Sequence, residues 1–255
     1  MEDQKIAKNV VMKRDVFLLN PKINLEEGVS IGERTLFASP DPGHHGSSET
    51  HIKREAYIGQ GCLVKAGITV GSRAIVQSGS VIDRDVPPNV IVGGNPIKIV
   101  GYVDSQKQNL RVSDQSISHS SENDPHLFHF PIFSDLRGDL IFAEIEKDIP
   151  FSVKRFFLVF NVPSSELRGE HAHKRCHQLL ICVKGSVSVV TDNGKQRKEY
   201  VLDSPTKGLH LPAMTWGVQY NYSEDATLLV IASERYDADD YIRDYDEFLK
   251  LIPSF

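Results

Sequence analysis

Two histidines, His171 and His173, stand two residues apart in the segment RGEHAHKRCHQ at positions 168–178. Side chains at this spacing leave the same face of a strand, so both rings would enter one lumen or lie on one surface. Imidazoles titrate near neutral pH, so one ring can take a proton while the other gives one. Imidazoles are also common metal ligands, so the spacing indicates either proton transfer or a metal site.

The residues that follow favour proton transfer over metal binding. A His-x-His pair followed by Gln178 and Gly185 resembles the first half of the cupin pattern, in which a Glu and a later His complete a metal site. Here Gln178 occupies the position of the Glu, and the segment AMTWGVQYN after Pro212 contains no His. Two imidazoles without a carboxylate form an incomplete ligand set, so we expect no metal. A metal-dependent or sugar-binding cupin remains the alternative.

The region around the two histidines predicts an antiparallel barrel. Short segments rich in β-branched and aromatic residues alternate with turn signals such as Asp192-Asn193-Gly194, which is typical of closely spaced antiparallel strands. We expect strands at 153–160, 178–191, 200–204, 208–212, 216–222 and 226–233. The last segment, DADDYIRDYDEFLKLI, places Tyr241, Tyr245, Phe248 and Leu249 at helical spacing and predicts a C-terminal helix.

The N-terminal part of the chain repeats every six residues. Aliphatic residues begin successive hexapeptides, and the segment 41–50, DPGHHGSSET, interrupts the phase as a projecting loop. A coil with three flat faces of six residues each explains such a period, whereas a helix or a plain strand does not. Residues 8–18 would add one poorer coil. The hexapeptides begin at Leu19, Leu25, Ile31, Ile52, Ile58, Val64, Val70, Val76 and Ile82.

The segment from Ile58 to Gly101, ending in DVPPNVIVGGNPIKIVG, resembles the hexapeptide acyltransferases, and among them the sugar-nucleotide N-acetyltransferases. This resemblance implies a trimer of left-handed parallel β-helices, with acetyl-CoA as co-substrate in the groove between subunits. Small residues at the corners would hold the pantetheine arm, and two basic residues would meet the phosphates. His44 and His45 in the projecting loop are candidates for a general base, with solvated loop histidines as the alternative. The implied cofactor-binding residues are Ala66, Gly67, Ser78, Gly79, Arg84 and Lys98.

The C-terminal part resembles the dTDP-4-oxo-6-deoxyglucose 3,4-ketoisomerases, which are cupin-like barrels. The matching blocks are SDLRGDL (134–140), DIPFSVKRFF (148–157), RGEHAHK (168–174), LDSPTKGLHLP (202–212) and ASERYDADDYIRDYDEF (232–248). By this resemblance His171 and His173 are the acid and base, and the protein forms dimers with exchanged first strands. Phe157 replaces a usual Tyr, and Gly217 stands where galacto-forming relatives can carry His. The implied substrate-binding residues are Arg137, Arg168, Lys174, Gln178 and Trp216.

Composition restricts the remaining possibilities. The chain has 255 residues, a net charge of −5 and no basic stripe, so we expect neither nucleic acid nor a membrane as a partner. Three scattered cysteines and the lack of an apolar leader favour the cytoplasm. We therefore predict an all-β protein: a left-handed β-helix acetyltransferase domain at 1–103, a flexible linker at 104–127, and a cupin-like ketoisomerase barrel with a C-terminal helix at 128–255.

These inferences combine into a bifunctional sugar-nucleotide enzyme. The barrel would isomerise dTDP-4-oxo-6-deoxyglucose, and the β-helix would acetylate a dTDP-3-amino-3,6-dideoxyhexose for surface polysaccharide. A trimeric β-helix joined to a dimeric barrel would close into a hexamer. The alternative is a ketoisomerase whose β-helix serves only as a trimerisation stalk, because a fold alone does not determine an activity.

Overall fold

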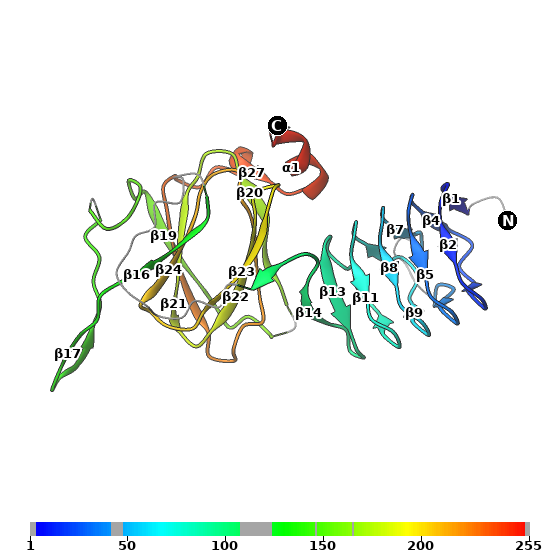
Figure 1. Ribbon diagram of the computed structural model, residues 1–255, viewed down its shortest axis with the longest axis horizontal. Helices are drawn as coiled ribbons and strands as arrows, with labels where there is room; N and C mark the ends of the chain where they lie inside the picture. The colour runs from blue at the N-terminus through cyan, green and yellow to red at the C-terminus, as the bar shows by residue number, and fades with distance from the viewer. Residues whose placement is uncertain (1–3, 42–47, 108–123, 146, 165, 253–255) are drawn as a thin grey trace. The chain divides into compact units, whose positions relative to one another are not determined.

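The computed structural model describes residues 4–41, 48–107, 124–145, 147–164 and 166–252, and the chain divides into two units, Met1–Asp104 and Ser105–Phe255 (Figure 1). The first unit is a parallel β-helix in which strands one coil apart pair side by side. One sheet contains β1 (Lys5–Ile6), β4 (Ile23–Leu25), β7 (Thr50–Ile52) and β10 (Thr69–Val70). A second contains β2 (Val11–Met12), β5 (Ser30–Ile31), β8 (Tyr57–Ile58), β11 (Ile75–Val76), β13 (Val90–Gly93) and β14 (Lys98–Tyr102), and a third contains β3 (Phe17–Leu18), β6 (Leu36–Phe37), β9 (Leu63–Val64) and β12 (Val81–Ile82).

The six-residue repeat corresponds to columns of stacked side chains inside the β-helix. Leu25 pairs with Ile52 and Ile52 with Val70, and all three are fully buried. The first predicted frame is displaced by one residue, because Leu18 pairs with Phe37 while Leu19 is exposed. The corner after β3 is correspondingly one residue longer, so the hexapeptide phase is lost there.

A glycine is required where one coil passes close to the next. A Cβ atom on Gly59 would lie 2.5 Å from the backbone nitrogen of Ser78, closer than non-bonded atoms approach. The predicted small residues of the repeat are therefore needed for the spacing between coils at this position.

The second unit is a barrel built from two sheets. One sheet has the order β15 (Gln106–Lys107), β23 (Arg197–Leu202), β22 (Val187–Asp192), β25 (Trp216–Tyr220), β20 (Arg168–His173) and β27 (Tyr241–Ile242). The other has the order β16 (His126–His129), β24 (Lys207–Leu211), β21 (Gln178–Lys184), β26 (Thr227–Ala232) and β19 (Arg155–Phe160). Their inner faces enclose an apolar core that includes Leu180, Val189, Leu202, Leu209 and Leu228. A separate hairpin, β17 (Phe133–Asp135) with β18 (Gly138–Leu140), extends away from the barrel (Figure 1).

The C-terminal segment differs from the single helix predicted for residues 237–252. A short 3-10 helix, η1 (Ala238–Asp240), is followed by strand β27, and helix α1 begins only at Tyr245 and ends at Leu251. Tyr241 and Ile242 pair with His173 and Ala172 of β20, so the sheet takes residues that helical spacing had assigned to the helix. Asp244 accepts a hydrogen bond from the backbone N–H of Glu247 and caps α1.

The segment predicted to be a flexible linker is ordered at both ends. Gln106 and Lys107 pair in parallel with Lys198 and Glu199 of β23, and β16 begins at His126. Residues 108–123 of the expected linker lie outside the described part of the chain.

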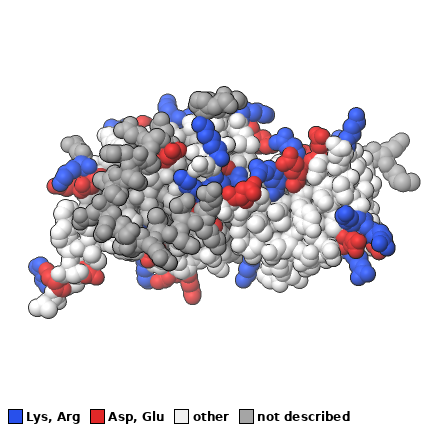
Figure 2. Space-filling view, viewed as in Figure 1, with Lys and Arg blue, Asp and Glu red and all other residues white. Residues whose placement is uncertain are grey.

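Charged side chains of both signs are interspersed on the face shown in Figure 2, in keeping with the small net charge. Within the described ranges, no helix has the length and apolar composition needed to cross a membrane.

Candidate active site

The two histidines lie on β20 at the wall of a cavity in the barrel. Their ring centroids are 5.0 Å apart and the rings are nearly perpendicular, at 85°. Both line a cavity together with Gln178, Gly217 and Gln219. A β-bulge lies directly before His171, where the register with β25 shifts between Gly169 and His171. Bulges redirect side chains at functional sites, and this one sets which residues of β20 enter the cavity.

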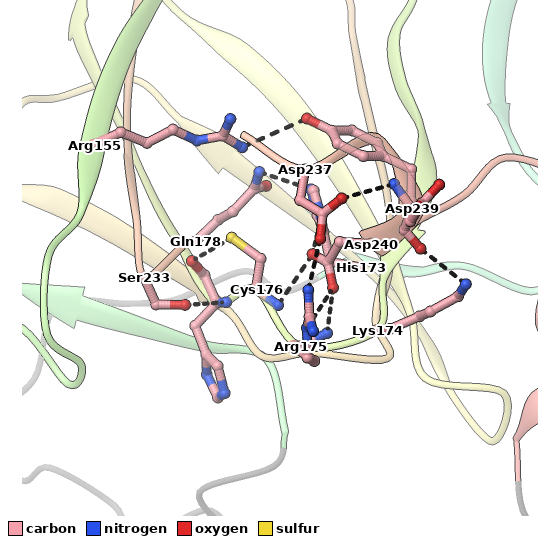
Figure 3. A network of polar contacts seen from close by, with 12 residues as sticks. Arg155, His173, Lys174, Arg175, Cys176, Gln178, Ser233, Asp237, Asp239 and Asp240 are labelled. Atoms are coloured by element: carbon pink, nitrogen blue, oxygen red, sulfur yellow. Dashed lines mark hydrogen bonds and ion pairs between the residues drawn. The ribbon is translucent and has the colours of Figure 1, made fainter. Parts of the chain in front are cut away.

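Asp240 forms a hydrogen bond with His173 and is not among the residues that line the cavity. The Asp240 Oδ2 atom lies 2.9 Å from His173 Nδ1, and both side chains are buried (Figure 3). Backbone N–H groups of Arg175 and Cys176 also donate to the two carboxylate oxygens, at 2.9 and 3.3 Å. Burial raises the pKa of Asp240, but the hydrogen bond from His173 and these N–H groups lower it, and the net pKa lies below its ordinary value. Asp240 is therefore an ionised carboxylate that accepts a hydrogen bond from the Nδ1–H group of His173.

This arrangement determines which nitrogen of His173 carries the proton. Because Nδ1 donates to Asp240, the neutral ring has its lone pair on Nε2, which lies 3.1 Å from the amide nitrogen of Gln178. Burial lowers the pKa of His173, and the hydrogen bond to Asp240 opposes that shift. A rotated Gln178 amide would present its oxygen to a protonated Nε2, so one side chain suits both protonation states.

His171 is held in the same tautomer by the backbone. Its Nδ1 lies 2.8 Å from the carbonyl oxygen of Gly169, so Nδ1 donates and Nε2 keeps its lone pair. Burial, with smaller contributions from His173 and Arg243, lowers the pKa of His171 to about 4. At neutral pH His171 is therefore an uncharged ring that can accept a proton at Nε2.

Four further residues lie at or beside the site although no sequence pattern assigned them to it: Asp240, Tyr241, Arg155 and Arg243. The Tyr241 ring lies 4.3 Å from the His173 ring and 4.9 Å from the His171 ring, measured between centroids. Arg243 lies over the Tyr241 ring, and Arg155 Nη2 is 3.5 Å from the Tyr241 hydroxyl. Tyr241 is the first residue of β27, and Arg243 directly follows the strand. Their spacing of two residues is typical of one face of a strand, but the helix predicted for this segment hid that pattern.

One group of possible metal ligands overlaps this site. In the described part of the chain, His173, Cys176 and Asp240 bring one ligand atom each to within 4.8 Å of one another. An ion bound between these residues would compete for the Asp240 oxygens that accept from His173 Nδ1 and from the two backbone N–H groups. The hydrogen bonds around Asp240 are those expected of a positioning carboxylate.

Of the predicted substrate-binding residues Gln178, Lys174 and Trp216, only Gln178 lines the cavity. Lys174 instead extends to the backbone oxygen of Asp239, at 2.8 Å (Figure 3). Trp216 differs from the expectation that it lines the sugar site, because alternation along β25 turns it to the opposite face from Gly217 and Gln219. There its ring packs against Tyr245 and Phe248 of α1, at centroid distances of 5.2 and 5.6 Å.

The two arginines predicted to bind substrate are exposed. Arg168 is the first residue of β20 and pairs in register with Gln219. Arg137 lies in the turn of the β17–β18 hairpin, where its guanidinium contacts Asp135 at 2.6 Å. Neither arginine lines the cavity that contains the histidine pair within one chain.

The predicted cofactor-binding residues of the β-helix lie at two corners and on its last strand. Ala66, Gly67 and Arg84 lie at the corner between the third sheet and the first, and the strands β6 and β7 flank the same corner. Gly67 has a φ of +79°, and its backbone N–H donates to Thr50 Oγ1. Ser78 and Gly79 are exposed at the corner between the second sheet and the third, where β11 leads to β12. Lys98 is the first residue of β14. His44 and His45 lie outside the described residues.

Comparisons with known proteins agree with this division into two parts. The family model described as "FdtA: WxcM-like, C-terminal" matches residues 123–253. The TDP-4-oxo-6-deoxy-alpha-D-glucose-3,4-oxoisomerase of Aneurinibacillus thermoaerophilus is 42% identical over 126 residues, which are 49% of this chain and 91% of that protein. A solved variant of the QdtA 3,4-ketoisomerase from Thermoanaerobacterium thermosaccharolyticum, in complex with TDP-4-keto-6-deoxyglucose, is 35% identical with a TM-score of 0.50. The match covers 52% of this chain and 96% of that one.

The N-terminal half is similar to hexapeptide acetyltransferases. The galactoside O-acetyltransferase of Escherichia coli (strain K12) is 24% identical over 107 residues, which are 36% of this chain. The chain spans about half of that protein, 53% of its length.

Proposed function

Because the chain belongs to the FdtA family (WxcM-like, C-terminal), as the match over residues 123–253 shows, we propose that its barrel converts dTDP-4-oxo-6-deoxyglucose into the 3-oxo isomer. The observation that carries this proposal is the pair of differently held imidazoles, buried at His173 and half-buried at His171, that line one cavity. Moving a carbonyl group to the neighbouring carbon needs a base and an acid at the same place, and two such rings provide both.

The reaction needs no external oxidant or reductant. His171 Nε2 takes the proton from C3, the C–H electron pair becomes a C3–C4 double bond, and the C4 carbonyl oxygen becomes the oxygen of an enediolate. His173 Nε2 then takes the proton of the C3 hydroxyl, which becomes the C3 carbonyl, and gives that proton to C4. Protonated His171 gives its proton to the C4 oxygen, which becomes a hydroxyl, so both rings end uncharged. His173 suits the second transfer, because Asp240 stabilises its charged form at 2.9 Å.

Replacement of the proposed base tests this assignment. We expect His171→Asn to lower the turnover of dTDP-4-oxo-6-deoxyglucose by at least about 10²-fold, the usual contribution of a positioned base. His129→Asn is the matched control, because His129 is exposed at the end of β16. NMR of the sugar ring measures the 3-oxo product. If His171→Asn turned over like the control, the acid–base assignment would be wrong.

We also propose that the barrel is dimeric, on the evidence of its exposed apolar surface. Phe156, Leu158 and Phe160 share one face of the edge strand β19 and are 71%, 48% and 57% exposed. In the projecting hairpin, Phe133 is half exposed and Leu136 fully exposed. An exchanged hairpin would cover such surface and bring the partner's Arg137 towards the cavity. Mixing inactive Arg137→Ala and His171→Asn proteins should then restore activity in mixed dimers, and failure to do so would contradict the exchange.

For the β-helix we propose acetylation of the amine of a dTDP-3-amino-3,6-dideoxyhexose by acetyl-CoA. The stacked corners with glycine or other small residues support this second activity, and His44 and His45 remain the candidate bases that the sequence predicts. The two sugar nucleotides share the thymidine diphosphate, which is a reason to join the two units in one chain. A trimeric β-helix with a dimeric barrel would form a hexamer. Mass spectrometry after incubation with both substrates should show the gain of one acetyl group, and no gain would leave the β-helix as a stalk.

A further inference from the structure

The inward face of β25 carries polar groups that the proposed acid–base chemistry does not use. Thr215, just before β25, alternates with Gly217 and Gln219, and all three line the cavity that contains His171 and His173. Thr215 is 4% exposed and Gln219 9% exposed. The strand therefore presents a hydroxyl and an amide to the same space as the two imidazoles.

The Thr215 hydroxyl is buried without a hydrogen-bond partner. Among the described residues, seven buried side-chain polar atoms have no hydrogen-bond partner. Of these, only Thr215 Oγ1 belongs to a residue that lines the cavity. Burying a hydroxyl without a partner is unfavourable, because it loses its hydrogen bonds to water. Such a group is explained where a bound molecule supplies the missing partner.

The space beside Thr215 is kept open by a glycine. Gly217 pairs directly with His171 across the two strands, so a side chain at position 217 would occupy the space in front of that ring. A Cβ atom on Gly217 would already lie 2.8 Å from Leu211 Cδ2. Gly217 therefore places no side chain between Thr215 and Gln219, opposite the proposed base.

We propose that the Thr215 hydroxyl contacts the substrate and donates a hydrogen bond to the enediolate oxygen formed during isomerisation. This inference rests on the proposed ketoisomerase function. Within one chain, the described residues that line the cavity include no lysine or arginine, so a neutral donor beside the protonated His171 is suited to stabilise the charge that develops on the C4 oxygen. A preorganised donor with no competing partner stabilises that charge more than the uncharged carbonyl of the substrate. The proton that leaves C3 is still taken by His171, and Thr215 itself keeps its proton.

Two substitutions separate this role from a structural one. Thr215→Val keeps the shape and removes the hydroxyl, and Thr215→Ser keeps the hydroxyl. We expect Thr215→Val to lower kcat by about 10²-fold, as loss of one oxyanion donor does, while Thr215→Ser stays within about threefold of wild type. Binding of dTDP, measured by calorimetry, should be the same for all three proteins, because dTDP lacks the reacting oxygens. The melting temperature of Thr215→Val should equal or exceed that of wild type, because a buried unpaired hydroxyl is removed.

Each other result overturns the proposal. If Thr215→Val kept wild-type kcat, the hydroxyl would not contact the reacting oxygen. If Thr215→Val and Thr215→Ser lost activity and melting temperature in parallel, Thr215 would be structural. The wild-type reaction in the same assay reports on the ketoisomerase itself, so a wild type that binds dTDP without turnover would show that the proposed function had failed first, and the Thr215 role with it.

Discussion

Replacing Asp240 by Asn tests the link between the buried carboxylate and the proposed catalysis. The carboxylate accepts hydrogen bonds from His173 Nδ1 and from the backbone N–H groups of Arg175 and Cys176, at 2.9, 2.9 and 3.3 Å. An Asn amide has one oxygen, so its NH₂ group must face at least one of these donors. Loss of one hydrogen bond to a charged group costs about 1.5–3 kcal/mol.

Asp240 stabilises the protonated form of His173 that arises during the proposed reaction, so its replacement should raise the activation free energy by a comparable amount. Each 1.36 kcal/mol in the activation free energy is a factor of ten, so we expect Asp240→Asn to lower kcat/KM for dTDP-4-oxo-6-deoxyglucose by about 10²-fold. The control is Asp239→Asn, because Asp239 is the exposed neighbour and its side chain does not contact His173. Steady-state assays by NMR compare the two variants. If Asp240→Asn retained activity within threefold of Asp239→Asn, then Asp240 would not position His173, and the reasoning would be refuted.

The remaining predictions concern pH and the β-helix. Burial, with smaller contributions from His126 and His177, lowers the pKa of His210 to about 3, below the value of about 6.5 in an unfolded chain. As pH falls through 6.5 the unfolded state takes up a proton that the folded state does not, so the free energy of unfolding should fall by about 2 kcal/mol from pH 7 to pH 5 on account of this residue. Urea denaturation measures the free energy of unfolding at pH 7 and at pH 5. The loss between the two pH values should be smaller in His210→Gln than in wild type by that amount. An equal loss in both proteins would contradict the lowered pKa of His210. In the β-helix, Gly59→Ala should lower the free energy of unfolding by about 1–3 kcal/mol, because its Cβ atom would overlap the next coil. Gly101→Ala is the control, because the nearest atom to its Cβ would be 3.9 Å away, and equal stabilities would contradict the coil contact.

The repeat made the β-helix predictable almost residue by residue. Each hexapeptide from Leu25 onward places its aliphatic residue in the interior, because the six-residue period is a direct consequence of the three-faced coil. The frame failed at Leu19, where a longer corner shifts the interior position to Leu18, since a corner can take an extra residue without changing the columns. Sequence periodicity alone does not show such an insertion.

The barrel site was predictable only in part. The spacing of His171 and His173 predicted a shared face because alternation on a strand is local. Asp240 was missed because it approaches His173 from 67 residues away in sequence, through a segment whose spacing favoured a helix. Trp216 was assigned to the sugar site by resemblance, but its parity on β25 places it against α1. The sequence pattern thus predicted the arrangement of residues within one strand. It did not predict contacts between segments that are distant in the sequence.

Incubation of the protein with dTDP-4-oxo-6-deoxyglucose in deuterated water, followed by NMR, tests the central claim most directly. Two separate histidines exchange their protons with solvent, so we predict a 3-oxo sugar nucleotide that carries deuterium at C4. A substrate that stayed unchanged would contradict the ketoisomerase assignment. A 3-oxo product without deuterium would contradict the acid–base pair, because the same hydrogen would then have moved from C3 to C4 directly or on a single group that does not exchange with solvent.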